Sequence, residues 1–193
     1  MRKLFLLLLI FSSVACGSRK ITADSAEKYE VENLAKVISQ NNLKDVYPDA
    51  QIAEGVDLFE EGTIERPYSI LYPETPDQLL IIWQDMSRSR PYQIYIEDEG
   101  KWRSQSGIAI GTKYEELEEI NSGPIKFYGF GWDYSGAVDW NDGKMADSNL
   151  RVFLAPVNAP PQSFYGDQII EADPEEILNL NLVVRAMVIH NGD

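Results

Sequence analysis

The residues that most often carry catalysis are scarce in this chain. It has one histidine, His190, and one cysteine, Cys16. A Ser-His-Asp or Cys-His device needs a histidine beside its nucleophile, and His190 is expected at the frayed end of a strand. Zinc usually takes several His or Cys ligands, and the glycines of residues 129–136 lie in a strand-like run instead of before a helix. We therefore expect no catalytic residue, no metal and no cofactor.

Carboxylates are numerous, and a suitably spaced pair of them can hydrolyse a glycosidic bond. One group is Glu97, Asp98 and Glu99, predicted at the end of a hairpin. A second group lies on the polar face and first turns of a predicted helix, where negative charge is favoured; it comprises Glu115, Glu116, Glu118 and Glu119. Because no pair stands out from its solvated neighbours, a hydrolase is the third functional hypothesis.

Aromatic side chains gather in residues 126–140, which read KFYGFGWDYSGAVDW. Every second residue from Tyr128 is large and mostly aromatic, so the pattern predicts one long strand. In the first interpretation these rings face a helix and belong to the core, which is favoured because soluble proteins rarely leave so much apolar surface bare. In the second they form a platform for a glycan or a partner protein. The candidate binding residues are Tyr128, Trp132, Tyr134 and Trp140.

The next residues predict a tight turn. Asp142-Gly143 is typical of a two-residue hairpin turn, with positive φ at Gly143 and Trp140 opposite Met145. The alternative is a calcium loop, since four oxygen-bearing side chains lie close together: Asp139, Asn141, Asp142 and Asp147. Their spacing does not match the EF-hand loop, which favours the turn.

Two helices and several strands must position these residues. Apolar spacing predicts helices over 25–41 and 113–121, the second opened by a capping box of Thr112 with Glu115. Residues 79–83 are continuously apolar, which predicts a central strand covered on both faces. Other strands are expected at QIAEGVDLF, PYSILY, PYQIYIED, NLRVFLAP and LNLVVRAMVIH.

This order of elements predicts an α+β fold. We expect antiparallel sheet with two amphipathic helices packed on one face. Two similar helix-then-strands units, 25–104 and 105–193, are one arrangement, and a single continuous domain is the other.

The N-terminus reads MRKLFLLLLIFSSVACGS. Its basic start, its apolar run over 4–11 and the small residues before Cys16 are typical of a signal peptide. Ser13-Val14-Ala15-Cys16 resembles the lipobox of bacterial lipoproteins, matching at Ala15 and Cys16. The resemblance implies removal of residues 1–15, attachment of acyl chains at Cys16, and a membrane anchor. Residues 16–24 are then the lipidated cysteine and a polar tether.

The same resemblance implies a location. Gly17 and Ser18 are not the acidic residues that retain some lipoproteins at the inner membrane, so the outer membrane of a bacterial cell envelope is favoured. Several acyl chains anchor a protein stably, whereas one is marginal.

A short segment at the second helix resembles two further families. Gly111, Leu117, Ile120 and Pro124 are similar to the strand–Gly–helix–Gly–Pro pattern of the small lipoprotein of the β-barrel assembly machinery and of the β-lactamase inhibitor proteins. Both are helix-on-sheet modules that bind other proteins, so the resemblance implies that kind of fold.

Composition limits the partners. The chain of 193 residues is 44% hydrophobic and carries a net charge of -14, which argues against nucleic acid, because that binding depends on Lys and Arg. Loss of Arg2 and Lys3 with the signal peptide leaves 15 basic and 31 acidic residues, a net charge of -16.

We therefore expect a cell-envelope lipoprotein with a non-catalytic α+β body. Its body is expected to bind or scaffold another envelope protein. The alternative is an envelope carbohydrate-binding protein that uses the aromatic residues of 128–140.

Overall fold

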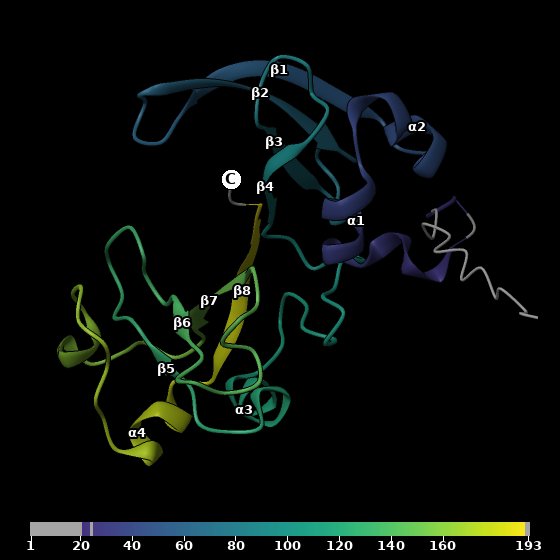
Figure 1. The fold of residues 1–193 in the computed structure, drawn as a ribbon. Coiled ribbons are helices and arrows are strands. Elements are labelled where there is room, and N and C mark those ends of the chain that lie inside the picture. Colours follow the sequence, from purple (N-terminus) through teal and green to yellow (C-terminus); the bar gives the residue numbers. More distant parts are fainter. Residues whose placement is uncertain (1–20, 24, 192–193) are drawn as a thin grey trace, which may run out of the picture.

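The computed structural model describes residues 21–23 and 25–191 and places them in an α+β fold (Figure 1). The predicted signal peptide, 1–15, and the predicted lipidation site, Cys16, lie outside the described residues. A six-stranded antiparallel sheet forms the centre, in the order β1-β2-β3-β4-β8-β7. The predicted α+β class with an antiparallel sheet is thus confirmed.

The strands of the large sheet are β1 (Ile52–Phe59), β2 (Ile64–Leu71), β3 (Leu79–Trp83), β4 (Pro91–Ile96), β7 (Leu150–Pro156) and β8 (Leu182–His190). A separate two-stranded sheet consists of β5 (Lys126–Phe127) and β6 (Val138–Asp139). The helical elements are η1 (Ala26–Tyr29), α1 (Val31–Val37), η2 (Gln40–Asn42), α2 (Leu43–Val46), α3 (Tyr114–Asn121), η3 (Gln162–Phe164) and α4 (Pro174–Asn179).

The helix predicted over 25–41 is divided at Glu30. This residue has an extended backbone (φ -90°, ψ 114°) and forms a parallel bridge with Arg103. The amide of Val31 donates to the Arg103 carbonyl at 3.0 Å. Pairing with a distant segment therefore outweighs the local helical pattern, and α1 begins only after this bridge.

The second predicted helix is confirmed as α3. Its predicted capping box is wrong, because Lys113 is the N-cap and the Thr112 hydroxyl accepts from the Ala109 amide at 2.9 Å. The Thr112 carbonyl in turn accepts from the Val184 amide at 2.8 Å. Thr112 thus joins the start of α3 to β8, and the helix is positioned by the sheet.

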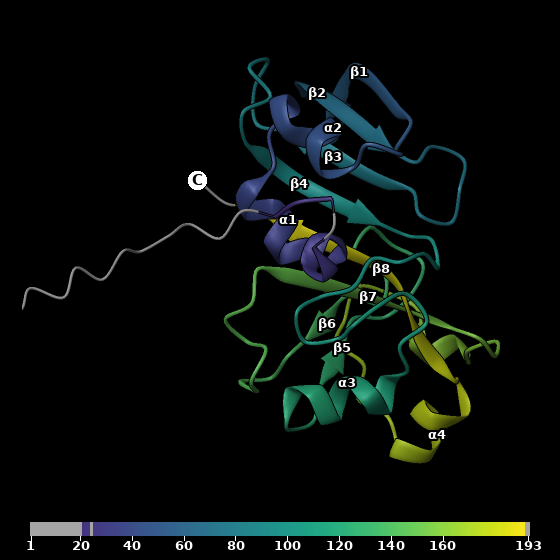
Figure 2. The ribbon, with the colours of Figure 1, turned by 90° about the vertical axis from the view of Figure 1, so that its right-hand side faces the viewer.

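Helices α1 and α2 lie over one face of strands β1 to β4, which we call the covered face (Figure 2). Its strand residues are almost fully buried with α1 and α2 residues in one hydrophobic cluster: Leu71, Leu79, Ile81, Trp83, Ile94 and Ile96. The indole of Trp83 donates to the hydroxyl of Ser69 at 2.9 Å. Burial of this face supplies the hydrophobic stabilisation of the first half.

The large sheet continues from the first half of the chain into the second. Strand β4 pairs with β8 through four successive partners, from Gln93↔His190 to Ile96↔Met187. The segments 25–104 and 105–193 therefore contribute strands to the same sheet.

The aromatic segment is a hairpin, so the long strand predicted within residues 126–140 is wrong. Phe127 pairs with Val138, and the Tyr128 amide donates to the Ala137 carbonyl at 2.9 Å. A wide loop joins the two short strands. Gly136 turns the chain back at φ +73°, and a Cβ there would lie 2.0 Å from the Leu154 carbonyl oxygen, so only glycine fits.

The predicted Asp142-Gly143 turn is displaced by one residue. The Gly143 amide donates to the Trp140 carbonyl at 2.9 Å, and Asn141 and Asp142 take the positive φ values of 47° and 60°. Glycine is needed at 143 for a different reason: a Cβ there would lie 2.1 Å from Nδ2 of the buried Asn121. That amide donates to the Trp140 carbonyl at 2.9 Å, and its oxygen accepts from the Met145 amide at 3.1 Å.

Candidate functional site

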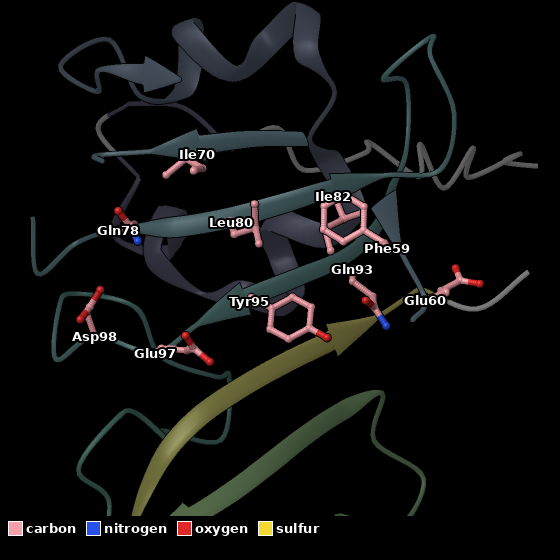
Figure 3. A pocket seen from close by; sticks show the side chains of 10 residues that line it. All are labelled: Phe59, Glu60, Ile70, Gln78, Leu80, Ile82, Gln93, Tyr95, Glu97 and Asp98. Carbon is pink, nitrogen blue, oxygen red and sulfur yellow. The ribbon is translucent and has the colours of Figure 1, made fainter. Parts of the chain in front are cut away.

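The face of strands β1 to β4 opposite the helices is the open face, and it carries the candidate site (Figure 3). Strand β3 is central, as predicted, but the predicted cover on both of its faces is confirmed only in part. Leu79, Ile81 and Trp83 point to the covered face and are buried. On the open face Ile82 is buried as well, whereas Leu80 is partly exposed. Period-2 alternation of side chains separates the two sets.

Apolar side chains run across the open face from strand to strand. Ile70, Leu80, Tyr95 and Val188 are successive cross-strand partners on β2, β3, β4 and β8. Phe59, at the end of β1, packs its ring 6.4 Å from that of Tyr68 in a T-shaped arrangement. Strands far apart in the sequence thus build one apolar surface.

This surface is hollowed. The open-face hollow has a volume of about 420 Å³ and a floor of five apolar or aromatic side chains: Phe59, Ile70, Leu80, Ile82 and Tyr95. Figure 3 shows these side chains on the same side of the strands, with the helices behind. Burial raises the pKa of the Tyr95 phenol above its ordinary value. The group is a neutral hydroxyl that can form hydrogen bonds.

One end of the hollow is polar but internally compensated. Glu60 forms a salt bridge with Arg66 at 2.9 Å. The hydrogen bond from Arg66 lowers the pKa of Glu60. The guanidinium also stacks over the ring of Tyr92, 3.8 Å from its centroid, and donates to the Gln84 carbonyl at 2.7 Å. The charge of Glu60 is therefore already balanced.

The single histidine lies beside this end. The expectation that His190 sits at a frayed strand end is wrong, because β8 lies between β4 and β7 and the His190 amide donates to the Asn149 carbonyl at 3.2 Å. Its Nδ1 is 2.9 Å from the side-chain nitrogen of Gln93, which lines the hollow. Its ring meets that of Tyr92 edge-on at 5.0 Å.

The other end of the hollow is acidic. Glu97 and Asp98 follow β4 and lie at its rim (Figure 3). A neighbouring hollow of about 590 Å³ shares Gln78 and Asp98 with the first. That second hollow adds two more carboxylates, Glu74 and Glu99. No salt bridge to any of these four carboxylates is present among the described residues.

The four predicted binding residues are not brought together as one platform. Trp140 is 7% exposed and belongs to the core, as do Phe127 and Phe130. The other three form an aromatic ladder at the surface, in which Trp132 lies 5.8 Å from Tyr128 and 5.2 Å from Tyr134, between ring centroids. Tyr134 is 54% exposed.

The loop that carries the aromatic ladder is held by several hydrogen bonds. The indole of Trp132 donates to the Gly129 carbonyl at 2.8 Å. The Gly131 amide donates to the Ser135 hydroxyl at 3.2 Å, and Arg185 donates to the Ser135 carbonyl at 3.0 Å. These bonds hold the loop and the Trp132 ring before any ligand arrives.

The remaining features of the chain concern the carboxylates of α3, metal sites and membrane-spanning helices. The carboxylates Glu115, Glu116 and Glu119 are exposed or partly exposed on α3. Over residues 21–23 and 25–191, no group of His, Cys, Asp and Glu is arranged to hold a metal ion, and no helix is long and apolar enough to cross a membrane.

Comparison with known proteins gives little beyond this geometry. No protein-family model matches the chain, and no curated protein matches it. Among solved structures, the crystal structure of the uncharacterized protein yfeY from Escherichia coli is similar, with a TM-score of 0.45 and 12% sequence identity. The likeness covers 73% of this chain and 82% of that chain. Nothing about function is carried from one chain to the other at this similarity.

Sequence reasoning missed the floor of the open-face hollow. Its signal was present in Leu80 and Ile82, which make β3 apolar on both faces. In the structure both residues line the hollow, where Leu80 is partly exposed and Ile82 is buried.

Proposed function

We propose that this chain is a lipid-anchored protein of the bacterial cell envelope whose α+β body binds another envelope protein through its open face. The observation that carries the proposal is the open-face hollow, with its apolar floor and polar rim. A concave apolar surface with a few polar groups at its edge is the usual form of a binding site. Exposed apolar surface of this kind marks interaction sites on soluble bodies.

The position of the anchor supports a role close to the membrane. Ile21 packs against the hydrophobic core, five residues after Cys16. An extended chain spans about 3.5 Å per residue, so acyl chains on Cys16 would hold the body within about 18 Å of the bilayer surface. The start of the described chain lies beside α1, on the side of the covered face (Figure 1). The open face is then directed away from the anchor.

Lipidation is tested by the variant Cys16→Ser. We expect it to leave the membrane fraction or to retain its signal peptide, and to take up no labelled palmitate. Equal incorporation of palmitate into Cys16→Ser and the natural chain would contradict the anchor.

Binding through the open face is tested by photo-crosslinking in cells that make the protein naturally. A photoreactive amino acid replaces Leu80 in one variant and Glu175, an exposed residue of α4, in the control. We expect a discrete crosslinked protein from position 80 and none of the same mass from position 175. Identical products from both positions, or none from position 80, would contradict a partner at the open face.

A second candidate function is glycan binding by the aromatic ladder, Tyr128, Trp132 and Tyr134. It is favoured by the exposure of Tyr134 and by the hydrogen bonds that fix the loop, since rigid aromatic rings recognise ligands at low entropic cost. Titration of the protein with envelope glycans, followed by tryptophan fluorescence, tests it. A saturable change that disappears in Tyr134→Ala would put this function first.

A further inference from the structure

We infer that the open-face hollow receives an extended protein segment that carries lysine or arginine next to an apolar side chain. The inference rests on the proposed function and specifies the chemistry of the partner. It follows from the floor of the hollow and from the unequal charge of its two ends.

The floor requires an apolar group. Ile70 and Leu80 are cross-strand partners, Tyr95 is the next partner in the row, and Phe59 adds an aromatic ring. An apolar group of a partner that covers this floor removes its partly exposed side chains from water, which favours binding. A volume of about 420 Å³ accommodates a small number of side chains and is far too small for a folded domain.

The rim requires positive charge at one end only. Glu60 is balanced by Arg66, whereas Glu97 and Asp98 have no salt bridge among residues 21–23 and 25–191. Glu74 and Glu99 extend this negative end into the adjoining hollow. A cation placed at this end would be attracted by Glu97 and Asp98, and a carboxylate would be repelled. The bound segment therefore has its basic side chain at the Glu97–Asp98 end.

The shape of the site favours an extended segment over a helix or a second copy of this chain. The hollow spans strands β1 to β4, and a strand lines it with alternate side chains, such as Leu80 and Ile82 on β3. An extended segment presents its own side chains with the same period. A second copy would bring another body with a net charge of -14 or -16 against the same acidic rim.

An array of immobilised nonapeptides of randomised sequence tests the inference. The full-length protein in detergent is applied to the array, and bound peptides are sequenced. We expect enrichment of lysine or arginine together with isoleucine, leucine, valine or phenylalanine, and binding that weakens at high salt. Selected peptides without a basic excess, or no selected peptide, would overturn the inference.

A matched pair of double variants separates the rim from general charge. Glu97→Gln with Asp98→Asn removes two charges at the rim, and Glu175→Gln with Glu176→Gln removes two from exposed positions on α4. For a selected peptide we expect the rim pair to weaken binding about three- to tenfold, as two exposed ion pairs allow. The α4 pair should change it less than about twofold. Equal losses in both pairs would overturn the assignment to the rim.

The remaining outcomes also decide the question. A dimer in sedimentation that Leu80→Ala dissociates would show that a second copy covers the face, against the inference. If position 80 crosslinks a partner whose contacting segment is acidic, the proposed function stands and the basic segment is wrong. If position 80 crosslinks nothing and the array selects no peptide, both fail together.

Discussion

Strand β3 and the β5–β6 hairpin are both rich in apolar side chains, yet they use them in different ways. In β3 core and surface side chains alternate along the strand: Ile81 lies in the core, and its neighbour Leu80 lies on the floor of an open hollow. In the hairpin the side chains differ between the base and the loop: Phe127 is buried in the paired base, and Tyr134 is exposed in the loop. From the sequence a core is the favoured interpretation of both segments, but in the structure each also carries an exposed part.

The difference shows that residue type alone does not separate a core from a binding surface. About half of a protein surface is apolar, so an apolar side chain becomes part of the core only when another element covers it. The helices α1 and α2 supply such a cover on one face of β3 (Figure 2). On the other face the cover is incomplete, because Leu80 is partly exposed.

The largest expected effect lies within the hairpin. Phe127→Ala removes a ring that is 1% exposed and packs against Tyr114, Phe130 and Phe164. We expect it to lower the free energy of unfolding by about 3–5 kcal/mol. Tyr134→Ala, seven residues later, should cost less than about 0.5 kcal/mol. Urea denaturation measures both free energies of unfolding. Similar costs for the two variants would contradict a buried base and an exposed loop in this hairpin.

A smaller effect is expected at the turn that follows the hairpin. Gly143→Ala places a methyl group against the amide of Asn121, whose hydrogen bonds join α3 to Trp140 and Met145. Overpacking of this kind costs about 1–3 kcal/mol. Gly123→Ala is the control, because a Cβ there meets nothing within 4 Å. An unchanged denaturation midpoint for Gly143→Ala would refute the close approach.

The smallest effect concerns a carboxyl on the side of the helices. Burial is the main cause that raises the pKa of Glu32 above its ordinary value of 4.5. The folded protein therefore binds this proton more tightly than the unfolded chain, and the resulting stability is present below about pH 4.5 and lost as the pH rises through the folded-state pKa. Its oxygen accepts from the Gln105 amide at 2.9 Å, a bond that glutamine can also make.

Glu32→Gln should accordingly have a higher urea midpoint than the natural chain at pH 7. The difference should disappear as the pH falls below 4.5, where Glu32 is protonated in both states. A Glu32→Gln variant that is less stable at pH 7 would show that the charged carboxylate is favoured by its surroundings.

Much of the fold could be predicted from local patterns. The antiparallel strands and α3 follow from alternation and from the spacing of Tyr114, Leu117 and Ile120, since these elements bury one face each. The break at Glu30 could not be predicted, because it depends on pairing with Arg103, 73 residues away in the sequence. The hairpin was missed because alternation through Gly131 and Gly136 looks the same whether the chain stays extended or turns.

The candidate site was less accessible to sequence reasoning. The aromatic ladder was identified in part, because Tyr128, Trp132 and Tyr134 stand out by type, whereas Trp140 is in the core. The floor of the hollow joins Phe59, Ile70, Leu80 and Tyr95 from four strands, and this meeting depends on the register of the sheet. Register is set by packing over the whole sheet and is not read from one segment.

The central claim is that β3 builds the core with one face and floors an open binding surface with the other. The free energies of unfolding of Ile81→Ala and Leu80→Ala, measured side by side in urea, test it most directly. Ile81→Ala should cost about 2–5 kcal/mol, because it leaves a closed cavity. Leu80→Ala should cost below about 1.5 kcal/mol, because water already reaches this side chain. Equal costs for the two neighbours would show that both faces of β3 are packed, and would contradict the open face.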